Sequence, residues 1–512
     1  MKRRMEKENK LEEGSGEVEN HEHLEQGDIR GDERSIAILF FLYLLQGIPL
    51  GLSAAIPMLL QNRSVSYRQQ AEFSLVNWPF SLKLFWAPIV DSVYLRKFGR
   101  RKTWLVPIQY LMGLFMLFLS GHVDKWIGNE AESLNIGLLT MLFFSLNLLA
   151  ATQDIVVDGW ALTMLKRCNV GYASTCNSVG QTAGYFLGYV LFMALESAKF
   201  CNDYLRSEPS DEGLLTLPGF LYFWGWVFIV TTTLIALLKH EHSRSNAKDT
   251  QVDMNITHAY KTLWMIVKLP SMKNMMLFLL TAKIGFSACD AVTSLKLVEA
   301  GIPKEKFAMI VVPMIPLQII LPIVISKYTS GPKPMNVYSM AIPYRLAFGL
   351  VAGALVWVTP YLISNGNVPG YYFVGLILIY FFHQICISSM FVASMAFFAK
   401  ISDPAVGGTY MTFLNTIANL GGNWPTTAAL WFVDALTFRQ CSNDASNDCS
   451  TAEEKGFCLK NGGACTTNLD GYYIEIILCF IIGCLWFRWG RRKIEFLQAR
   501  PLSAWKVVRS RS

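Results

Sequence analysis

Twelve apolar blocks alternate with short polar segments along the chain. A run of about 20 apolar residues spans the hydrocarbon core of a membrane as an α-helix. One such block would also suit a buried helix of a water-soluble protein, but no soluble core needs so many. The pattern predicts an all-α polytopic membrane protein with twelve transmembrane helices, at residues 36–58, 71–90, 103–121, 137–158, 173–195, 218–238, 274–295, 307–326, 345–363, 371–395, 410–432 and 471–488.

The composition supports this class. Of the 512 residues, 52% are apolar and only 16% are charged, whereas soluble domains carry about a quarter charged residues. Residues 1–34 are polar and rich in charge, without the apolar stretch of a cleaved signal peptide. We therefore expect a disordered tail there, followed by a first helix that acts as an uncleaved insertion signal.

Lysine and arginine are concentrated in alternate loops. They follow the second and fourth predicted helices, the sixth helix and the last helix. Because cytosolic loops carry this excess, both termini and a linker at 239–273 are predicted to be cytosolic. The net charge of +7 reflects this bias, so no nucleic-acid partner is expected. The linker separates an N-terminal half at 35–238 from a C-terminal half at 274–489, and a second cytosolic tail covers 490–512.

Four of the eleven cysteines, Cys441, Cys449, Cys458 and Cys465, lie in a segment at 437–470 on the predicted luminal side. Closely spaced cysteines in an oxidising compartment usually form disulfides, and their spacing does not match paired zinc ligands. The sequence predicts two disulfides and no metal site, and it leaves the pairing open. On the same side, Asn62 begins a sequon and is a predicted glycosylation site.

Short motifs recur in the same order in both halves. The matched stretches are 50–55 with 284–289, 79–90 with 313–324, and 172–184 with 410–422. They relate the first helix to the seventh, the second to the eighth and the fifth to the eleventh. Parallel six-helix repeats are the plan of the major facilitator superfamily, in which the substrate binds between the halves near mid-membrane. The chain is therefore predicted to have the major facilitator fold, with two parallel six-helix halves.

The loop after the second helix resembles a motif of that superfamily. Asp91 is followed by Gly99, Arg100 and Arg101, although the spacing is longer than usual. In the superfamily the acid and the arginine latch helix ends in one conformation. The resemblance implies a gating role for these side chains, while a plain cluster of positive charge is the alternative.

Longer strings resemble the acetyl-coenzyme A transporter family over residues 35–505. They are AATQDIVVDGWA at 150–161, GYASTCNSVGQTAG at 171–184, LTAKIGFSA at 280–288, GGTYMT at 407–412 and NLGGNWP at 419–425. This resemblance implies a multi-pass protein of the endoplasmic reticulum membrane. It would move cytosolic acetyl-CoA into the lumen for luminal acetylation, with acetyl-CoA as cargo and no cofactor. Bacterial muropeptide permeases are distant relatives, so the cargo can differ.

A site for acetyl-CoA needs cations for phosphate, an aromatic face for adenine and polar groups for the amide arm. Ionisable residues inside membrane helices are costly and mark candidate functional sites. The predicted substrate-binding residues are Lys83, Lys283, Asp290, Asn177, Gln181, Asn415, Trp78, Trp424 and Tyr185.

Several embedded charges could also brace the helices. Asp154 and Asp158 lie four residues apart near the cytosolic face, where they could accept protons or pair with Lys83 or the arginine cluster, and we assign them to gating. Lys283 and Asp290 share one helical face, so they could bind phosphate or take part in ion pairs.

Three other embedded residues receive structural interpretations. Lys296 is expected to extend its amine towards the luminal surface. Arg345 is expected to be an interface anchor. His383 is expected to make a satisfied hydrogen bond to a neighbour, with a proton relay as the alternative.

Other functions remain open at this point. The same cations would serve another large anion, such as a glutathione-type or peptide-like molecule. A transmembrane acetyltransferase would need a catalytic base at depth, for which His383 is the one embedded histidine. A receptor or scaffold would not need ionisable residues in its helices. Uniport, exchange for CoA and proton coupling all fit the sequence, as does a homo-oligomer in the lipid bilayer.

Overall fold

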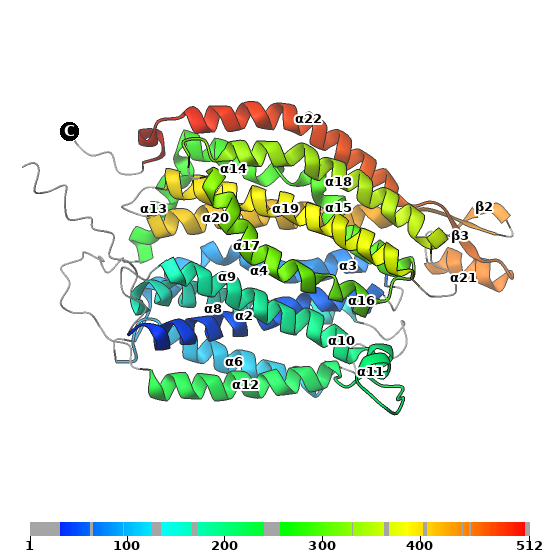
Figure 1. Cartoon of the computed structure of the whole chain (residues 1–512), viewed down its shortest axis with the longest axis horizontal. Coiled ribbons are helices and arrows are strands. Elements are labelled where there is room, and N and C mark those ends of the chain that lie inside the picture. Colours follow the sequence, from blue (N-terminus) through cyan, green and yellow to red (C-terminus); the bar gives the residue numbers. More distant parts are fainter. Residues whose placement is uncertain are drawn as a thin grey trace, which may run out of the picture.

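A computed structural model of the chain describes residues 31–61, 65–95, 97–123, 135–165, 171–239, 256–329, 331–362, 368–402, 407–442, 444–449 and 452–506. Ten helices in these ranges are long and apolar enough to cross a membrane. They run side by side along the long axis of the molecule (Figure 1). The described chain is therefore an α-helical bundle with one small sheet, as the apolar pattern predicts.

The N-terminal half lies in the lower part of Figure 1. Its elements are α2 (Glu33–Gln61), α3 (Tyr67–Ser74), η1 (Leu75–Asn77), α4 (Trp78–Leu82), η2 (Lys83–Phe85), α5 (Ala87–Ser92), α6 (Lys102–Ser120), α8 (Ile136–Met164), α9 (Gly171–Phe186), η5 (Leu187–Leu191), α10 (Phe192–Glu196), α11 (Ala198–Tyr204) and α12 (Leu217–Leu238).

The C-terminal half lies above it in the same view. Its elements are α13 (Ile256–Lys268), α14 (Pro270–Thr281), η6 (Ile284–Phe286), α15 (Ser287–Glu299), α16 (Lys304–Met309), α17 (Val311–Thr329), α18 (Met335–Leu362), α19 (Gly370–Ile401), α20 (Gly407–Ala435), β1 (Phe438–Cys441), β2 (Asp444–Asp448), α21 (Ala452–Lys460), β3 (Cys465–Leu469), α22 (Gly471–Ala499) and η8 (Leu502–Trp505).

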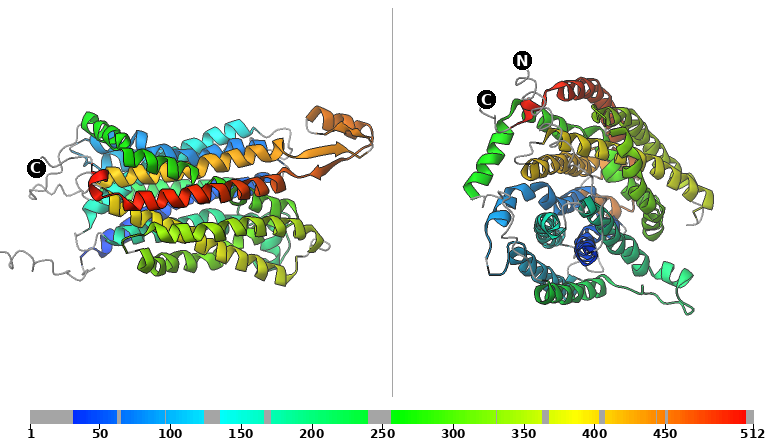
Figure 2. Two further views of the ribbon diagram at one scale, coloured as in Figure 1. Left: turned by 90° about the horizontal axis from the view of Figure 1, so that it is seen from above. Right: turned by 60° about the vertical axis from the view of Figure 1, so that its left-hand side comes forward.

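The two ends of the bundle differ. The first residues of α2, the last residues of α22 and the helix α13 lie at one end, and the three-stranded sheet projects from the other (Figure 1, Figure 2). We call these the terminal end and the sheet end. α20 runs from the terminal end to the sheet, so it crosses the bundle like the ten strongly apolar helices (Figure 2).

The second predicted helix is broken into short pieces. Residues 67–92 form α3, η1, α4, η2 and α5 instead of one helix over 71–90. α4 and α5 each begin one residue before a proline, Pro79 and Pro88. A proline lacks the amide hydrogen, and its ring clashes with the carbonyl one turn earlier, so the helix restarts at each proline. Lys83 lies between these two restarts.

The apolar core is shared by the halves at one end and divided at the other. One cluster joins buried side chains of both halves near the sheet end, among them Phe73 and Leu295. At the terminal end, a cluster around Trp160 draws its buried side chains from the N-terminal half. Another, around Phe278 and Trp505, draws its buried side chains from the C-terminal half, including α13. The halves thus share one buried cluster at the sheet end. At the terminal end each half has its own buried cluster, and Leu84 and the Tyr260–Phe85 hydrogen bond link the halves there.

Glycines allow close helix crossings in both halves. A Cβ added to Gly184 of α9 would lie 2.0 Å from the carbonyl oxygen of Leu44 on α2. A Cβ added to Gly421 of α20 would lie 2.1 Å from the carbonyl oxygen of Leu279 on α14. Small residues let membrane helices approach at backbone distance, so these positions fix two crossings that hold the bundle together.

The sheet is antiparallel, with the strand order β2-β1-β3. Disulfides join Cys441 to Cys458 and Cys449 to Cys465. The prediction of two disulfides is confirmed, and the structure supplies the pairing that the sequence left open. The predicted glycosylation site Asn62 lies outside the described residues.

Candidate functional site

Lys83 is held inside the N-terminal half by Asp154. The two side chains form an ion pair, and the amide of Gln46 donates to the same carboxylate. The Lys83 and Asp154 side chains are only 12% and 7% exposed, and removing one partner of a buried pair leaves an uncompensated charge. The structure therefore supports the ion-pair interpretation, and substrate binding by Lys83 stays a prediction.

Asp158 lies one helical turn beyond Asp154 on α8. Its carboxylate accepts a hydrogen bond from the Tyr43 hydroxyl at 2.8 Å and one from the Asn177 amide at 3.2 Å. These donors come from α2 and α9, so the acid links three helices of the N-terminal half. The predicted residues Asn177 and Asp158 are thus brought together, and their functional roles stay predictions.

The predicted latch residues meet at the terminal end. Arg101 Nη1 lies 2.6 Å from Asp91 Oδ1, and Arg100 Nε donates to the Asp91 carbonyl at 2.9 Å. Gly159 of α8 leaves room for this contact, because a Cβ there would lie 2.3 Å from the Arg101 guanidinium. Arg101 therefore connects α5, through Asp91, with α8, while gating by these residues stays a prediction.

A cavity of about 300 Å³ lies in the C-terminal half. Its walls come from α14, α15, α18, α19 and α20. The lining combines charged, polar and apolar side chains, among them Lys283, Asp290, Arg345, Ser394, Asn419, Asn423, Thr426, Tyr338, Met390 and Phe391. Two of the charged residues that the sequence singled out, Lys283 and Asp290, therefore share one cavity.

Lys283 lies where the seventh membrane segment is interrupted between α14 and η6. Its amine is 3.4 Å from the carbonyl oxygen of Ala418, and it has no ion pair within the part of the chain that the structure describes. A Cβ at Gly422 would lie 3.0 Å from this amine, so the glycine keeps the space beside it open. An embedded cation without an acid is costly, so an anion in the cavity would be stabilised there.

Asp290 pairs with Arg345 and not with Lys283. Arg345 Nη2 lies 2.5 Å from Asp290 Oδ2, and Arg345 is only 6% exposed. The guanidinium also lies 4.4 Å from the centre of the Phe286 ring. The expectation that Arg345 is an interface anchor is wrong, because a carboxylate from a neighbouring helix compensates its charge in the interior.

His383 faces the second oxygen of the same carboxylate. Its Nε2 lies 3.7 Å from Asp290 Oδ1, and this buried nitrogen has no hydrogen-bond partner among the described residues. The expectation of a satisfied hydrogen bond is therefore wrong. Cys289 adds a third donor atom within 4.8 Å, but the Arg345 guanidinium already neutralises Asp290 and disfavours a metal cation beside it.

The two predicted tryptophans use their indole groups to hold helices together. Trp78 Nε1 donates to Thr427 Oγ1 at 3.3 Å, and Trp424 Nε1 donates to the Leu280 carbonyl at 2.9 Å. The first bond links the two halves, and the second lies within the C-terminal half. Stacking of adenine on either ring stays a prediction.

The remaining predicted residues are spread over the bundle. Tyr185 packs against Tyr189 in the N-terminal half, with ring centres 5.6 Å apart. The carbonyl of Gln181 faces α2 at the glycine crossing. Asn415 of α20 has a buried amide oxygen without a hydrogen-bond partner in the described chain. The structure does not bring these three side chains to the wall of the C-terminal cavity.

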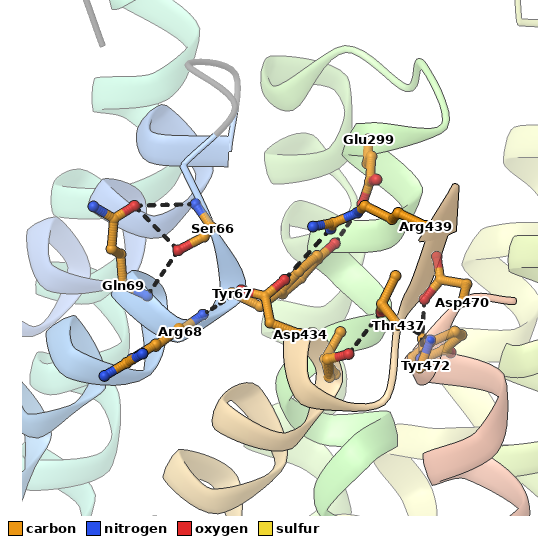
Figure 3. A network of polar contacts seen from close by, with 12 residues as sticks. Ser66, Tyr67, Arg68, Gln69, Glu299, Asp434, Thr437, Arg439, Asp470 and Tyr472 are labelled. Atoms are coloured by element: carbon orange, nitrogen blue, oxygen red, sulfur yellow. Dashed lines mark hydrogen bonds and ion pairs between the residues drawn. The ribbon is translucent and has the colours of Figure 1, made fainter. Parts of the chain in front are cut away.

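The two halves are joined by polar contacts at the sheet end (Figure 3). The Tyr67 hydroxyl donates to Glu299 at 2.5 Å, and the backbone amide of Arg68 donates to Asp434 at 2.8 Å. Each bond links α3 of the N-terminal half to a helix of the C-terminal half. We call Tyr67, Arg68, Glu299 and Asp434 the sheet-end gate.

Lys296 supports this gate from within the C-terminal half. Its amine lies 3.0 Å from Glu299, forms an ion pair with Asp470 and lies 4.7 Å from the centre of the Tyr67 ring. The residue is only 6% exposed. The expectation that Lys296 extends towards the luminal surface is wrong, because two acids hold its amine inside the bundle.

A second set of contacts joins the halves beside the cavity. The Ser74 and Thr427 hydroxyls lie 2.7 Å apart. Asn423, which lines the cavity, donates to Ser81 Oγ at 2.7 Å and to the Asn77 carbonyl at 3.2 Å. One wall of the cavity is therefore connected directly to the broken helix of the other half.

The sequence did not predict the gate residues Tyr67, Glu299 and Asp434. They lie near the ends of membrane segments, where polar residues are common, so no pattern distinguishes them. The sequence did draw attention to the region of Gly159, since this residue follows Asp158 inside a string that resembles the acetyl-coenzyme A transporter family. Its role becomes visible only when the Arg101 side chain is placed against it.

The sequence matches the family described as acetyl-coenzyme A transporter 1 over residues 35–254, 242–357 and 344–507. An uncharacterised protein of Schizosaccharomyces pombe is 35% identical over 477 residues, which cover 93% of this chain and 89% of that protein. An uncharacterised membrane protein of Saccharomyces cerevisiae is 31% identical over 548 residues, which cover 92% of this chain and 97% of that protein.

Solved structures with a similar fold are transporters. A bacterial homologue of the human lysosomal transporter Spinster, in an inward-facing and occupied conformation, has a TM-score of 0.54 at 12% identity and covers 93% of this chain and 99% of its own. A nucleoside transporter has a TM-score of 0.56 at 12% identity and covers 90% and 99%. These likenesses concern the fold alone, which is that of the major facilitator transporters. The family match, which extends over nearly the whole chain, establishes that the chain belongs to the acetyl-coenzyme A transporter family.

Proposed function

We propose that this membrane transporter carries acetyl-CoA from the cytosol into the lumen of the endoplasmic reticulum by alternating access, where it supplies acetyl groups for luminal acetylation. Membership of the family and the shared fold make the chain a membrane transporter. The cargo, the compartment and the direction are the proposal.

The observation that carries the proposal is the unpaired amine of Lys283 beside Arg345 in the cavity. Lys283 and Arg345 bring two positive charges and Asp290 brings one negative charge, which leaves a net charge of +1 in this part of the cavity. Arginine and lysine are the usual protein ligands of phosphate. The cavity therefore suits the phosphate groups of acetyl-CoA.

The size of the cavity bears on how the cargo would bind. About 300 Å³ is at the lower end of the volumes of small-molecule sites, and acetyl-CoA is a large, extended molecule. The cavity would hold its phosphate end, and the remainder would lie between the halves. Asn423 lies where the cavity meets the N-terminal half, which supports this arrangement.

The proposed direction rests on the difference between the two ends. Disulfides persist in oxidising compartments such as the endoplasmic reticulum lumen, so we assign the sheet end to the lumen and the terminal end to the cytosol. The excess of Lys and Arg near the terminal end supports the same orientation. With the halves packed together at the sheet end, this conformation would receive its cargo from the cytosol.

Uptake into sealed liposomes by the purified protein tests the proposal. Acetyl-CoA is labelled in the acetyl group in one sample and in the adenine in another. Equal uptake of both labels means that the molecule crosses intact. Entry of the acetyl label alone would identify a transmembrane acetyltransferase. Entry of neither label, with uptake of glutathione disulfide or a muropeptide, would support the alternative of another large anion.

Lys283→Ala tests the cavity. Hydrogen bonds to charged groups contribute about 1.5–3 kcal/mol, so we expect KM for acetyl-CoA to rise about tenfold or more. Lys273→Ala removes an exposed lysine from the same membrane segment and is the matched control. An unchanged KM in a folded Lys283→Ala protein would place the phosphate site elsewhere.

A further inference from the structure

We propose that a proton on His383 and an anionic substrate at Arg345 bind cooperatively, so that this transporter carries a proton together with its substrate. The inference rests on the proposed function in one respect, namely that the anion is the transported molecule. The three side chains that carry the argument are His383, Asp290 and Arg345, which come from α19, α15 and α18.

Asp290 lies between two groups that compete for it. One carboxylate oxygen, Oδ2, is 2.5 Å from Arg345 Nη2, and the other, Oδ1, is 3.7 Å from His383 Nε2. The first distance is a strong charge-assisted hydrogen bond. The second is too long for a hydrogen bond, but a rotation of either side chain would close it. The carboxylate can therefore accept a hydrogen bond from the guanidinium, from the imidazole or from both.

The present arrangement leaves polar atoms unsatisfied. His383 Nε2 and Arg345 Nε are both buried and have no hydrogen-bond partner in the described chain. A buried polar atom without a partner costs free energy. In the neutral tautomer with its proton on Nδ1, Nε2 is an acceptor that faces Asp290. Protonation turns Nε2 into a cationic donor towards this carboxylate, so the site gains a contact when it takes up the proton.

Among the described residues, Asp290 is the carboxylate that lies next to His383 and would interact with its proton. In the described chain, Asp290 and Cys289 of α15 and Arg345 of α18 are the ionisable groups that face His383. α17 and α20 also pack against α19, and their charged residues, Lys327 and Asp434, lie at helix ends. The Phe348 ring covers another side of the imidazole, 6.3 Å between centres.

Charge links the proton to the anion. When His383 is neutral, the net charge of Lys283, Arg345 and Asp290 is +1. When His383 is protonated, the net charge of the four side chains is +2. The second cation also draws Asp290 away from Arg345, which frees the guanidinium for a phosphate. The anion therefore binds more tightly as the pH falls, and by thermodynamic linkage the bound anion favours the protonated histidine by the same factor.

Proteoliposomes that contain a trapped pH indicator test this coupling. We expect KM for acetyl-CoA in the wild type to fall at least about fivefold between about pH 8 and about pH 6, with acidification of the vesicle interior during uptake. His383→Gln keeps a polar side chain that does not titrate. We expect this variant to transport acetyl-CoA without acidifying the vesicle interior, and its KM should change with pH only as far as the charge of acetyl-CoA itself changes. His258→Gln, which removes an exposed histidine on α13, should behave like the wild type.

A second measurement uses only the wild-type protein, so it remains informative if His383→Gln does not fold. Wild-type protein in a weakly buffered detergent solution should take up protons when acetyl-CoA is added, and no uptake of protons would overturn the proposal. In the liposomes, acidification by His383→Gln at the wild-type rate, or a pH-independent KM in the wild type, would also overturn it.

Sulfate separates this inference from the proposed function, because its charge is constant over this pH range. We expect sulfate to raise Tm of the wild type more at about pH 6 than at about pH 8, and to lose this difference in His383→Gln. If acetyl-CoA does not enter at any pH while the sulfate effect persists, the cargo assignment fails and the coupling stands. If the sulfate effect is the same at both pH values, the coupling fails whatever the cargo.

Discussion

Gly159 is a single position at which one added methyl group should have a clear effect. A Cβ there would lie 2.3 Å from the Arg101 guanidinium, so Gly159→Ala must displace the partner of Asp91. Overpacking of this kind costs about 1–3 kcal/mol, and we expect a lower Tm in thermal unfolding. Gly137→Ala, on the same helix and 3.6 Å from its nearest neighbour, is the control. Equal Tm values for both variants would mean that Arg101 adjusts freely.

Embedded charges could be found in the sequence, but only some of their partners could. The pairs Lys83–Asp154 and Asp91–Arg101 lie within the regions that the sequence linked. Asp290 and its guanidinium partner are 55 residues apart and lie on different helices. A helical pattern indicates which residues share a face of one helix, whereas contacts between helices depend on how the helices pack. This is why Arg345 was misread.

At the scale of secondary-structure elements, the bundle depends on close crossings between helices. Gly184 of α9 meets the backbone of α2 with no room for a side chain, since a Cβ there would lie 2.0 Å from the Leu44 carbonyl oxygen. Gly184→Val should force the two helices apart, cost more than about 3 kcal/mol and reduce the fraction of monodisperse protein in size-exclusion chromatography. Gly375→Val, on α19 with nothing within 4 Å of its Cβ position, should leave that fraction unchanged. Similar losses in both variants would contradict this account of the crossing.

The apolar pattern located the membrane segments well and their internal breaks poorly. The continuous helix α18 begins ten residues before its predicted start, and α19 ends six residues after its predicted end, because hydropathy reports the apolar core and not the helix caps. Pro79 and Pro88 were visible in the sequence, but a proline can either kink a helix or end it.

At the scale of the whole molecule, the sheet-end gate should set which side is open. Tyr67→Phe removes the hydroxyl that binds Glu299, a contact worth about 1.5–3 kcal/mol. We expect a shift towards a conformation that is open at the sheet end, seen as a longer distance between spin labels at Tyr204 and Leu459. Tyr371→Phe changes an exposed tyrosine and is the control. Identical distance distributions would show that other contacts hold this end closed.

The division into two halves followed from the internal repeat, but the conformation did not. Repeated motifs record which helices correspond, and both conformations of an alternating-access protein contain the same helices. The shared apolar cluster at the sheet end and the separate clusters at the terminal end identify the conformation. That information lies in which side chains meet across the halves, such as Tyr67 and Glu299.

The disulfide-bonded sheet has a mechanical consequence. β1 continues from α20, and β3 leads into α22, while the two strands pair with each other and the disulfides cross-link the segment between them. These links tie together the ends of α20 and α22 at the sheet end, so the two ends would move together. α20 carries both Asp434 of the gate and Asn423 of the cavity wall. A rotation of this unit would therefore release the gate and reshape the cavity in a single movement.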